Sequence, residues 1–307
     1  MQHKHIVVSD KTRCSGCSAC SSVCPKQCIT LREDAMGSKY PEVDTTTCIE
    51  CGACVKVCPF INPATPATPL KCFAAVNKNN DVRIKSSSGG IFNALARQVV
   101  LGGGDIFGAA FNKDWMVEHV STDNMSGVKR MMGSKYVQSD TLATFNEAKK
   151  LLMAGRKVLY SGTPCQIAGL NHFLRKDYPN LITVEVICHG APERGVWRNY
   201  LKEITARPTW ERVGKIRFCP PRKGEEAVIS DISFRDKRNG WKKFGFALLE
   251  KFIIRTFSGK LIHERILEKL ILASVMLRLS GQKRPKPCRP HNRRLLGYRK
   301  HRHNARR

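Results

Sequence analysis

The 307-residue sequence has no apolar run of about 18 residues or more, the length that a membrane-spanning helix needs. Its N-terminal segment, MQHKHIVVSDKTRC, has no hydrophobic core of the kind that a secretory signal contains. Hydrophobic residues make up 42% and charged residues 25%, a globular balance that excludes wholesale disorder. We therefore expect a cytoplasmic protein without a membrane partner, built as one large domain or two modest ones.

Acidic residues are missing from one part of the chain only. Residues 281–307 contain 11 Lys and Arg and no Asp or Glu, so they supply 11 of the 28 units of net positive charge. The rest of the chain mixes both signs, which is typical of ordinary solvated surfaces. A nucleic-acid-binding protein is the alternative that charge favours, but Tyr298 is the single aromatic residue in this basic tail. We expect no nucleic-acid partner.

Cysteine, in contrast, is abundant, with 14 residues. Cytoplasmic thiols stay reduced, so this number indicates metal binding or catalysis rather than disulfides. Two runs share the spacing C-x2-C-x2-C-x3-C-P, and the second lies 34 residues after the first. Their members are Cys14, Cys17, Cys20 and Cys24, and then Cys48, Cys51, Cys54 and Cys58.

This spacing is that of two-cluster ferredoxins, in which the fourth cysteine of each run ligates the other cluster. It predicts two 4Fe–4S clusters with crossed ligand sets, namely Cys14, Cys17, Cys20 and Cys58 for one and Cys48, Cys51, Cys54 and Cys24 for the other. Structural zinc is the alternative, but it usually takes two separated pairs of ligands and fits two runs of four poorly. Cys28 and Cys72 lie off the pattern, and we expect them to be ordinary buried thiols.

The sequence predicts four segments. Residues 1–62 form a two-cluster ferredoxin-type domain of α+β class, and the proline-rich residues 63–70 form a stiff linker. Residues 71–250 alternate between strand and helix patterns, which predicts an α/β domain with a partly parallel sheet. Residues 251–307 fit no clear element.

Two turn-like segments of the α/β domain suit an anion. KSSSGG, residues 85–90, precedes a helix, and its N–H groups and hydroxyls suit a phosphate. The alternative is a serine cap with a glycine turn. GSKYVQSD, residues 133–140, brings Lys135, which suits a phosphate or a reduced flavin unless it is simply solvated.

Two further segments end expected strands. SGTPCQ, residues 161–166, follows the strand KVLY, with Thr163 as a helix cap and Pro164 at the first helical position. ICHG, residues 187–190, follows the strand LITVEVI. If the two strands are parallel, Cys165, Cys188 and His189 meet at one carboxyl edge of the sheet, where open α/β folds bind ligands. Core packing is the alternative for each cysteine.

The order of these motifs, from the two cysteine runs through SSSGGIF, VLYSGTPCQIAGL and ICHGAPE to SFRDKRNGW, closely resembles the beta-subunit family of coenzyme F-420 hydrogenase/dehydrogenase in its ferredoxin-fused bacterial form. The resemblance covers residues 10 to about 248. It implies an iron–sulfur flavoprotein that holds FAD in the α/β domain. By this resemblance, nine residues are candidates for the flavin pocket: Ser87, Ser88, Gly89, Gly90, Lys135, Thr163, Pro164, Cys165 and Gln166.

The resemblance ends near residue 248, where the family continues with stretches like PSCYxCPAK and IGDYWGIE that this chain lacks in its reading frame. Permitted codons for residues 273–280 and 292–300, read one base out of register, encode both stretches. We therefore expect a frameshift between about Leu249 and Ser258, and a poorly folded tail over residues 251–307. A genuine basic tail is the alternative.

Three functions follow from this sequence. The first is a cytoplasmic oxidoreductase that passes electrons between a soluble donor protein, two 4Fe–4S clusters and FAD, and on to a small organic acceptor such as the deazaflavin coenzyme F-420. Cys165 and His189 are its candidate catalytic residues. The second is a non-catalytic electron-transfer subunit that feeds a partner enzyme. The third is an inactive truncated product.

Overall fold

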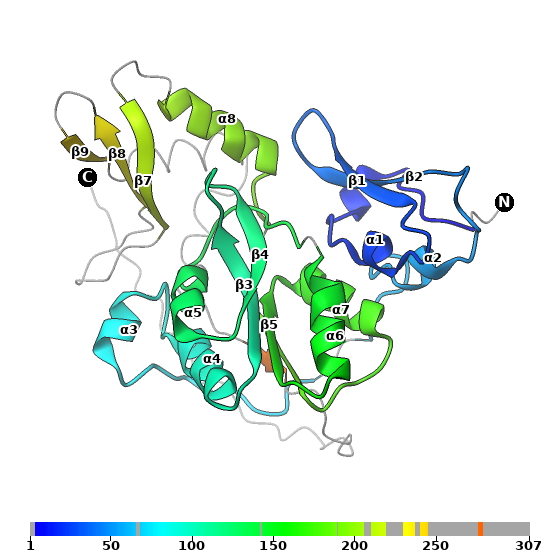
Figure 1. Cartoon of the computed structure of the whole chain (residues 1–307), viewed down its shortest axis with the longest axis horizontal. Coiled ribbons are helices and arrows are strands. Elements are labelled where there is room, and N and C mark those ends of the chain that lie inside the picture. The colour runs from blue at the N-terminus through cyan, green and yellow to red at the C-terminus, as the bar shows by residue number, and fades with distance from the viewer. Residues whose placement is uncertain are drawn as a thin grey trace, which may run out of the picture.

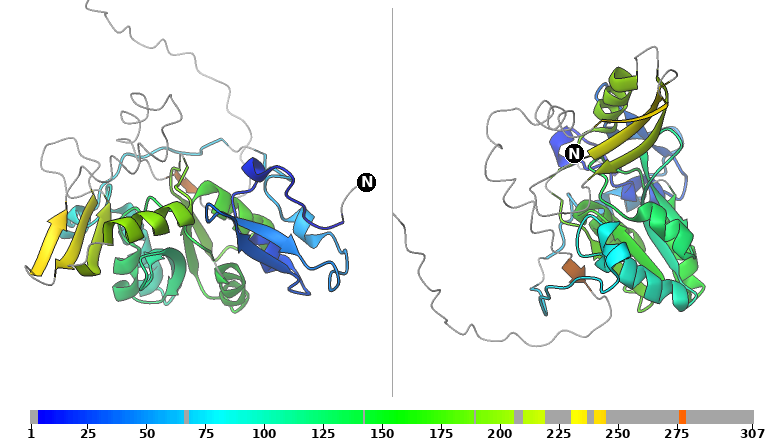
Figure 2. Two further views of the ribbon diagram at one scale, coloured as in Figure 1. Left: turned by 90° about the horizontal axis from the view of Figure 1, so that it is seen from above. Right: turned by 90° about the vertical axis from the view of Figure 1, so that its left-hand side faces the viewer.

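The computed structural model describes residues 4–65, 68–141, 143–188, 190–205, 210–218, 230–236, 240–244 and 276–278. These residues form a small N-terminal domain, a central α/β domain and a separate antiparallel sheet (Figure 1). The N-terminal domain lies beside helices α6 and α7 of the central domain, and the separate sheet lies at the far side, next to α8 (Figure 2). No helix of the described residues is long and apolar enough to cross a membrane.

The N-terminal domain has the α+β character that the cysteine runs predict. Its elements are η1 (Lys11–Arg13), α1 (Ala19–Val23), β1 (Ile29–Glu33), β2 (Lys39–Val43) and α2 (Ala53–Lys56). Strands β1 and β2 pair antiparallel, with Ile29 opposite Val43 and Glu33 opposite Lys39. Each cysteine run therefore contributes one loop and one short helix to a domain closed by a single hairpin.

The two cysteine loops repeat one backbone shape. Two residues in each loop adopt the left-handed region: Gly16 (φ 62°) and Ser18 (φ 67°) in the first, and Glu50 (φ 50°) and Gly52 (φ 68°) in the second. These positions are related by the same 34-residue shift that relates the cysteines. The duplication seen in the sequence is thus also a duplication of local structure.

The central sheet has the strand order β10-β6-β5-β3-β4. Its strands are β3 (Asp105–Phe111), β4 (Val117–Thr122), β5 (Val158–Gly162), β6 (Leu181–Glu185) and β10 (Met276–Arg278). Strands β3, β5 and β6 run parallel, whereas β4 and β10 pair antiparallel to their neighbours. The predicted partly parallel sheet is therefore confirmed.

Helices cover both faces of this sheet. They are α4 (Ile91–Leu101), α5 (Met125–Met131), α6 (Thr144–Met153) and α7 (Pro164–Leu174). The central part of the chain also contains α3 (Asn80–Ile84) and α8 (Arg194–Thr205), and α8 lies next to the separate antiparallel sheet (Figure 1). Because side chains alternate along a strand, Ile106 and Leu159 pack with α4 and α5, whereas Phe107 and Tyr160 pack with α6 and α7. The core beneath α6 and α7 also takes in Ala19 of α1, so the two domains share it.

The third sheet contains β7 (Trp210–Phe218), β8 (Ser230–Asp236) and β9 (Gly240–Phe244), all antiparallel. Strands were expected near β7 and β8. The stretch CFAAVNK, residues 72–78, is predicted to be a strand, and this prediction is wrong, since these residues form no strand. Instead this segment runs across the KSSSGG turn, where the Asn77 N–H donates to the Gly89 carbonyl at 2.6 Å.

Most of residues 251–307, and with them most of the expected frameshifted tail, lie outside the described residues. Within this tail the structure describes Met276–Arg278 as β10, at the edge of the central sheet beside β6. This strand is a departure from the expected lack of a defined fold.

Candidate metal centres and the adjoining sheet edge

One group of four thiols lies at the boundary between the two domains. Burial raises the pKa of Cys14, and the nearby Cys58 adds to the rise. Burial likewise raises the pKa of Cys17 to about 11, and raises that of Cys20, with Cys58 contributing to both. Cys58 of the second run therefore lies near the first three cysteines of the first run. We call these four residues the inner set.

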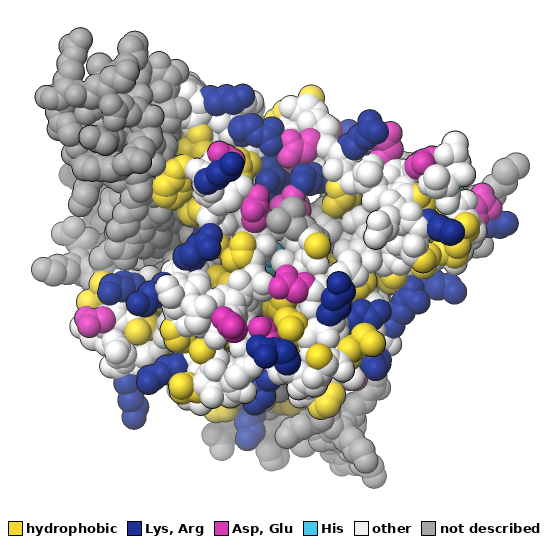
Figure 3. Space-filling view, viewed as in Figure 1, with side chains coloured by type: hydrophobic (Ala, Val, Ile, Leu, Met, Phe, Trp, Pro, Cys, Tyr) yellow, Lys and Arg dark blue, Asp and Glu magenta, His cyan; other side chains and the backbone are white. Residues whose placement is uncertain are grey.

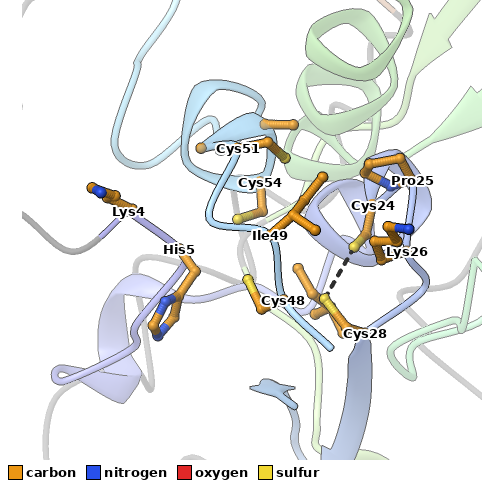
Figure 4. A pocket seen from close by; sticks show the side chains of 13 residues that line it. Lys4, His5, Cys24, Pro25, Lys26, Cys28, Cys48, Ile49, Cys51 and Cys54 are labelled. Atoms are coloured by element: carbon orange, nitrogen blue, oxygen red, sulfur yellow. Dashed lines mark hydrogen bonds between the residues drawn. The ribbon is translucent and has the colours of Figure 1, made fainter. Parts of the chain in front are cut away.

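A second group of thiols lines a cavity in the N-terminal domain. Cys24 of the first run lines it together with Cys48, Cys51 and Cys54 of the second run (Figure 4). Cys54 is buried, Cys24 and Cys48 are partly buried, and Cys51 is exposed. We call these four residues the outer set, and the crossed ligand assignment stays a prediction.

Cys28 also belongs to the surroundings of the outer set, which sequence reasoning missed. Its side chain is 7% exposed and lines the same cavity. Its Sγ lies 3.4 Å from the Cys24 Sγ (Figure 4). Cys28 is therefore a fifth thiol against the outer set, and its place four residues after Cys24 was the available signal. Cys72, expected to be buried, is exposed.

Backbone N–H groups point at the thiols of both sets. The Ile6 N–H donates to the Cys54 Sγ at 3.2 Å, and the Glu50 N–H donates to the Cys48 Sγ at 3.4 Å. In the inner set, the N–H of Ala19 donates to Cys17. Such donors stabilise thiolates and tune bound clusters. Among the described residues no three potential ligands converge on a point where one ion would fit. Thiols with backbone N–H groups directed at them are the kind of ligand that a 4Fe–4S cluster takes.

The inner set lies directly against helix α7. A Cβ placed on Gly169 of α7 would lie 3.0 Å from the Cys17 Sγ and 3.2 Å from the Cys17 Cβ. The Cys165 thiol, one turn earlier in α7, is close enough to raise the pKa of Cys17 further, after burial as the main cause. The inner set is thus the one that borders the α/β domain.

Polar contacts fix this domain boundary. The Gln138 side chain donates to the Ser15 carbonyl at 2.7 Å, and the Thr141 hydroxyl donates to the Cys17 carbonyl at 3.3 Å. Lys39 of β2 forms an ion pair with the buried Asp140. Residues 138–141 therefore run along the first cysteine loop and hold it by two side chains, while a third side chain holds β2.

A second group of contacts lies at the start of α8. Glu33 of β1 accepts from Arg198 at 2.8 Å, and lies 3.8 Å from the buried Arg194. A Cβ on Gly37 would lie 2.2 Å from the Gly195 nitrogen, so both glycines are needed for the close approach of these two segments of the chain. The β1–β2 hairpin is therefore seated firmly on α8.

The SGTPCQ turn begins α7 as the sequence predicts. The Gln166 Oε1 accepts from the Thr163 N–H at 3.0 Å, and Pro164 is the first helical residue. The Thr163 Oγ1 lies 3.2 Å from the Cys165 Sγ. The predicted cap is confirmed, and it leaves Cys165 partly buried on the side of the inner set.

A buried histidine supports this turn, and the sequence analysis missed it. His119 of β4 is 2% exposed, with Nε2 2.9 Å from the Ser161 carbonyl and Nδ1 3.0 Å from the Ser139 Oγ. The carbonyl can only accept, so Nε2 carries the proton and Nδ1 accepts from Ser139. Ser139 in turn accepts from the Gln166 amide at 2.9 Å. Burial lowers the pKa of His119 to about 4.

The predicted phosphate turn and the Lys135 segment do come together. The Ser87 hydroxyl accepts from the Ser134 N–H at 2.6 Å, at the N-terminus of α4. The Lys135 ammonium, however, donates to four carbonyls at the end of α5, at 2.9 to 3.1 Å from Arg130, Met131, Met132 and Gly133. Burial lowers the pKa of Lys135 to about 7. Lys135 is therefore engaged as a helix cap.

The backbone geometry of the KSSSGG turn by itself accounts for glycine at positions 89 and 90. A Cβ on Gly89 would lie 2.6 Å from the Ala75 carbonyl oxygen, and Gly90 has a left-handed backbone with φ 76°. These glycines thus allow residues 75–77 to cross the turn. Whether Ser88 and the other turn residues also hold a phosphate stays a prediction.

Cys165 and Cys188 lie at the same edge of the sheet, as expected. Strands β5 and β6 are parallel, with Gly162 opposite Glu185, so both segments leave the sheet at its carboxyl edge. Cys188 is exposed, and its Sγ accepts from the Gly190 N–H at 3.4 Å. His189 lies outside the described residues.

Two family models match this chain. The 4Fe-4S dicluster domain matches residues 13–62, which confirms the predicted two-cluster domain. The C terminus of the coenzyme F420 hydrogenase/dehydrogenase beta subunit matches residues 155–269. This second match contains the SGTPCQ and ICHG segments and continues past residues 249–258, the interval in which the frameshift was expected.

A solved chain is also similar, from the F420-reducing [NiFe] hydrogenase complex of Methanosarcina barkeri, studied by xenon derivatization. The similarity has a TM-score of 0.38 at 16% identity, over 60% of this chain and 63% of that chain. This chain thus spans less than two thirds of that one. No curated protein matches.

Proposed function

The chain belongs to the coenzyme F420 hydrogenase/dehydrogenase beta-subunit family, and we propose that it is an iron–sulfur flavoprotein oxidoreductase. The inner and outer sets of cysteines hold two 4Fe–4S clusters, which supply single-electron transfer when bound. The observation that carries the proposal is the contact of the inner set with α7, because it joins a redox centre to the α/β domain.

The organic half of the reaction is assigned to the carboxyl edge of the central sheet. The N-terminus of α4 lies on one face of this edge and the SGTPCQ turn of α7 on the other. Helix N-termini favour anionic groups, so the α4 turn with Ser87 suits the phosphates of FAD. Cys165 lies on the side of the inner set and His189 in the neighbouring segment, so both remain candidate catalytic residues.

The electron donor of this scheme is a soluble protein, and the acceptor is a small organic molecule such as a deazaflavin. The protein itself contributes orientation and shields the reacting groups from water. On the face seen in Figure 3, Lys and Arg side chains are interspersed with Asp and Glu, as on an ordinary protein surface. This mixture supports a soluble partner rather than a polyanion such as nucleic acid.

A non-catalytic electron-transfer subunit is the second candidate. It is favoured by the position of the cavity beside the outer set, which is lined by residues of the N-terminal domain and by none of the predicted flavin residues. In this case the protein passes electrons to a partner that holds the substrate.

Anaerobic purification of the full chain separates the two candidates. The oxidoreductase predicts about eight irons and one flavin per chain, and steady-state reduction of an organic acceptor by the isolated protein. Iron without flavin, and no turnover with any acceptor, supports the electron-transfer subunit. A preparation that holds only zinc overturns both.

A further inference from the structure

The two sets of cysteines differ in what covers them. The outer set includes the exposed Cys51, and its cavity is lined by the exposed residues Lys4 and Lys26. The inner set has no exposed member, and Cys17 lies under α7 of the other domain. The ferredoxin-type domain thus presents one site to solvent and one to the α/β domain.

Gly169 makes the inner contact possible. It lies in the middle of α7, where alanine is the better helix former by about 1 kcal/mol, so helix stability alone does not call for glycine. A Cβ at this position would lie 3.0 Å from the Cys17 Sγ and 3.5 Å from the Ala19 Cβ. The missing side chain therefore serves the approach of Cys17.

Residues 138–141 hold the other side of the same loop. Thr141 is 1% exposed, and its hydroxyl donates to the carbonyl of Cys17 itself. Two residues earlier, Ser139 donates to His119 and accepts from Gln166 of the SGTPCQ turn. One short segment thus connects the backbone of an inner-set cysteine to the turn that begins α7.

We infer that Gly169 and Thr141 are positioning residues that hold the inner set, through Cys17, against the α/β domain, and that this set is the point of redox contact between the domains. The inference rests on the proposed function and adds the order in which electrons pass the two sets of cysteines. With both clusters and a flavin bound, the outer set would face the soluble partner, and the inner set would hold the cluster that borders the α/β domain and supplies single electrons to it, with no bond formed or broken.

The test uses the full chain, prepared anaerobically with both clusters, and measures the potential and EPR signal of each. Gly169→Ala is expected to shift the potential and signal of the inner cluster and to leave those of the outer cluster unchanged. Ala168→Ser, a change of similar size at the neighbouring position of α7, is the matched control and is expected to shift neither. Cys28→Val is the reciprocal variant, expected to shift the outer cluster only, because the Cys28 Sγ lies 3.4 Å from Cys24.

Thr141→Val gives a second measurement that does not depend on how Gly169→Ala folds. It removes the hydrogen bond to the Cys17 carbonyl with little change of volume, and the same inner signal is expected to shift. The inference is overturned if the outer signal moves in either variant, or if neither signal moves.

A rate measurement separates this inference from the proposed function. After photochemical reduction of the clusters, the first electron is expected to reach the flavin more slowly in Gly169→Ala than in the wild type, and at the wild-type rate in Ala168→Ser. If no electron reaches a flavin in the wild type, the proposed function fails, while the potentials still decide the role of Gly169. If wild-type transfer is fast and only Cys28→Val slows it, the outer cluster is the contact and the inference is wrong.

Discussion

Ser18 and Gly52 share one left-handed backbone conformation, with φ 67° and ψ 3° at Ser18 and φ 68° and ψ 4° at Gly52. Each residue precedes the short helix of its own cysteine loop, at equivalent positions of the duplication. The glycine adopts this conformation without strain, whereas the serine carries the cost of a Cβ. The Ser18 hydroxyl is also buried and has no hydrogen-bond partner among the described residues.

Ser18→Gly is therefore expected to stabilise the protein by about 1 kcal/mol, because it removes both the strain and the unpaired hydroxyl. Gly52→Ala is the matched change in the other loop and is expected to destabilise by a similar amount. Denaturant unfolding of the cluster-containing protein measures both. Equal effects of the same sign at the two positions would contradict the backbone argument.

The crossed ligand sets predict an unusual result for Cys24. Although Cys24 belongs to the first cysteine run, it lines the cavity of the outer set. Cys24→Ser is expected to damage the outer cluster and to leave the inner signal intact, with about half of the iron retained. Iron analysis and EPR measure this. Loss of the inner signal instead would mean that each run holds its own cluster.

The buried His119 predicts a dependence of stability on pH. Its pKa falls from 6.5 to about 4 in the folded protein, so the unfolded chain binds the additional proton between these values. The contribution of His119 to the free energy of unfolding is therefore fully present above pH 6.5. It decreases as the pH falls, and at pH 5 the free energy of unfolding is about 2 kcal/mol lower. Unfolding measured from pH 7.5 to pH 5 tests this. His119→Gln is the control, and its stability is expected to vary less over this range.

Gly89→Val is expected to lower flavin occupancy while iron content stays unchanged. The new side chain would collide with the Ala75 carbonyl, displace residues 75–77 and disturb the N-terminus of α4. Gly102→Val at the other end of α4, where a Cβ meets only ordinary contacts at 3.5 Å, is the control. Unchanged flavin content in Gly89→Val would remove the KSSSGG turn from the flavin site.

Resequencing of the gene tests the expected frameshift. If the shift is real, the corrected gene sequence will encode the family's own residues after the region near residue 250, including a further C-x-x-C pair. The family match in the present reading frame continues to residue 269, past the interval of residues 249–258 in which the shift was expected. An unbroken frame in good reads, with a well-packed C-terminal segment, would show that the basic tail is genuine.

The parts of the site that could be predicted from sequence are those set by local spacing. The two cysteine runs determine which thiols group together, and the adjacent strands β5 and β6 determine that Cys165 and Cys188 share an edge. The cap of α7 by Thr163 and Gln166 is also local, since it spans three residues.

The parts that could not be predicted depend on contacts between distant segments. His119 meets the carbonyl of Ser161, 42 residues later, and no local pattern marks it. From its residue type alone, Lys135 is predicted to face solvent or to bind an anion. In the structure its ammonium instead donates to four backbone carbonyls at the end of α5. Residues 72–78 have strand-like composition, yet hydrogen bonds from Asn77 to the KSSSGG turn hold them outside the sheet.

The long sequence separation of the domain contacts has a consequence for how the protein is made. Gln138 and Thr141 reach Ser15 and Cys17 across 123 and 124 residues, and Arg198 reaches Glu33 across 165. The N-terminal domain emerges first during synthesis and is complete before any of these partners exists. The inner site is therefore open to cluster insertion on the growing chain and closes when α7 folds over it. Iron supply during translation, rather than after it, is then expected to decide the yield of the two-cluster protein.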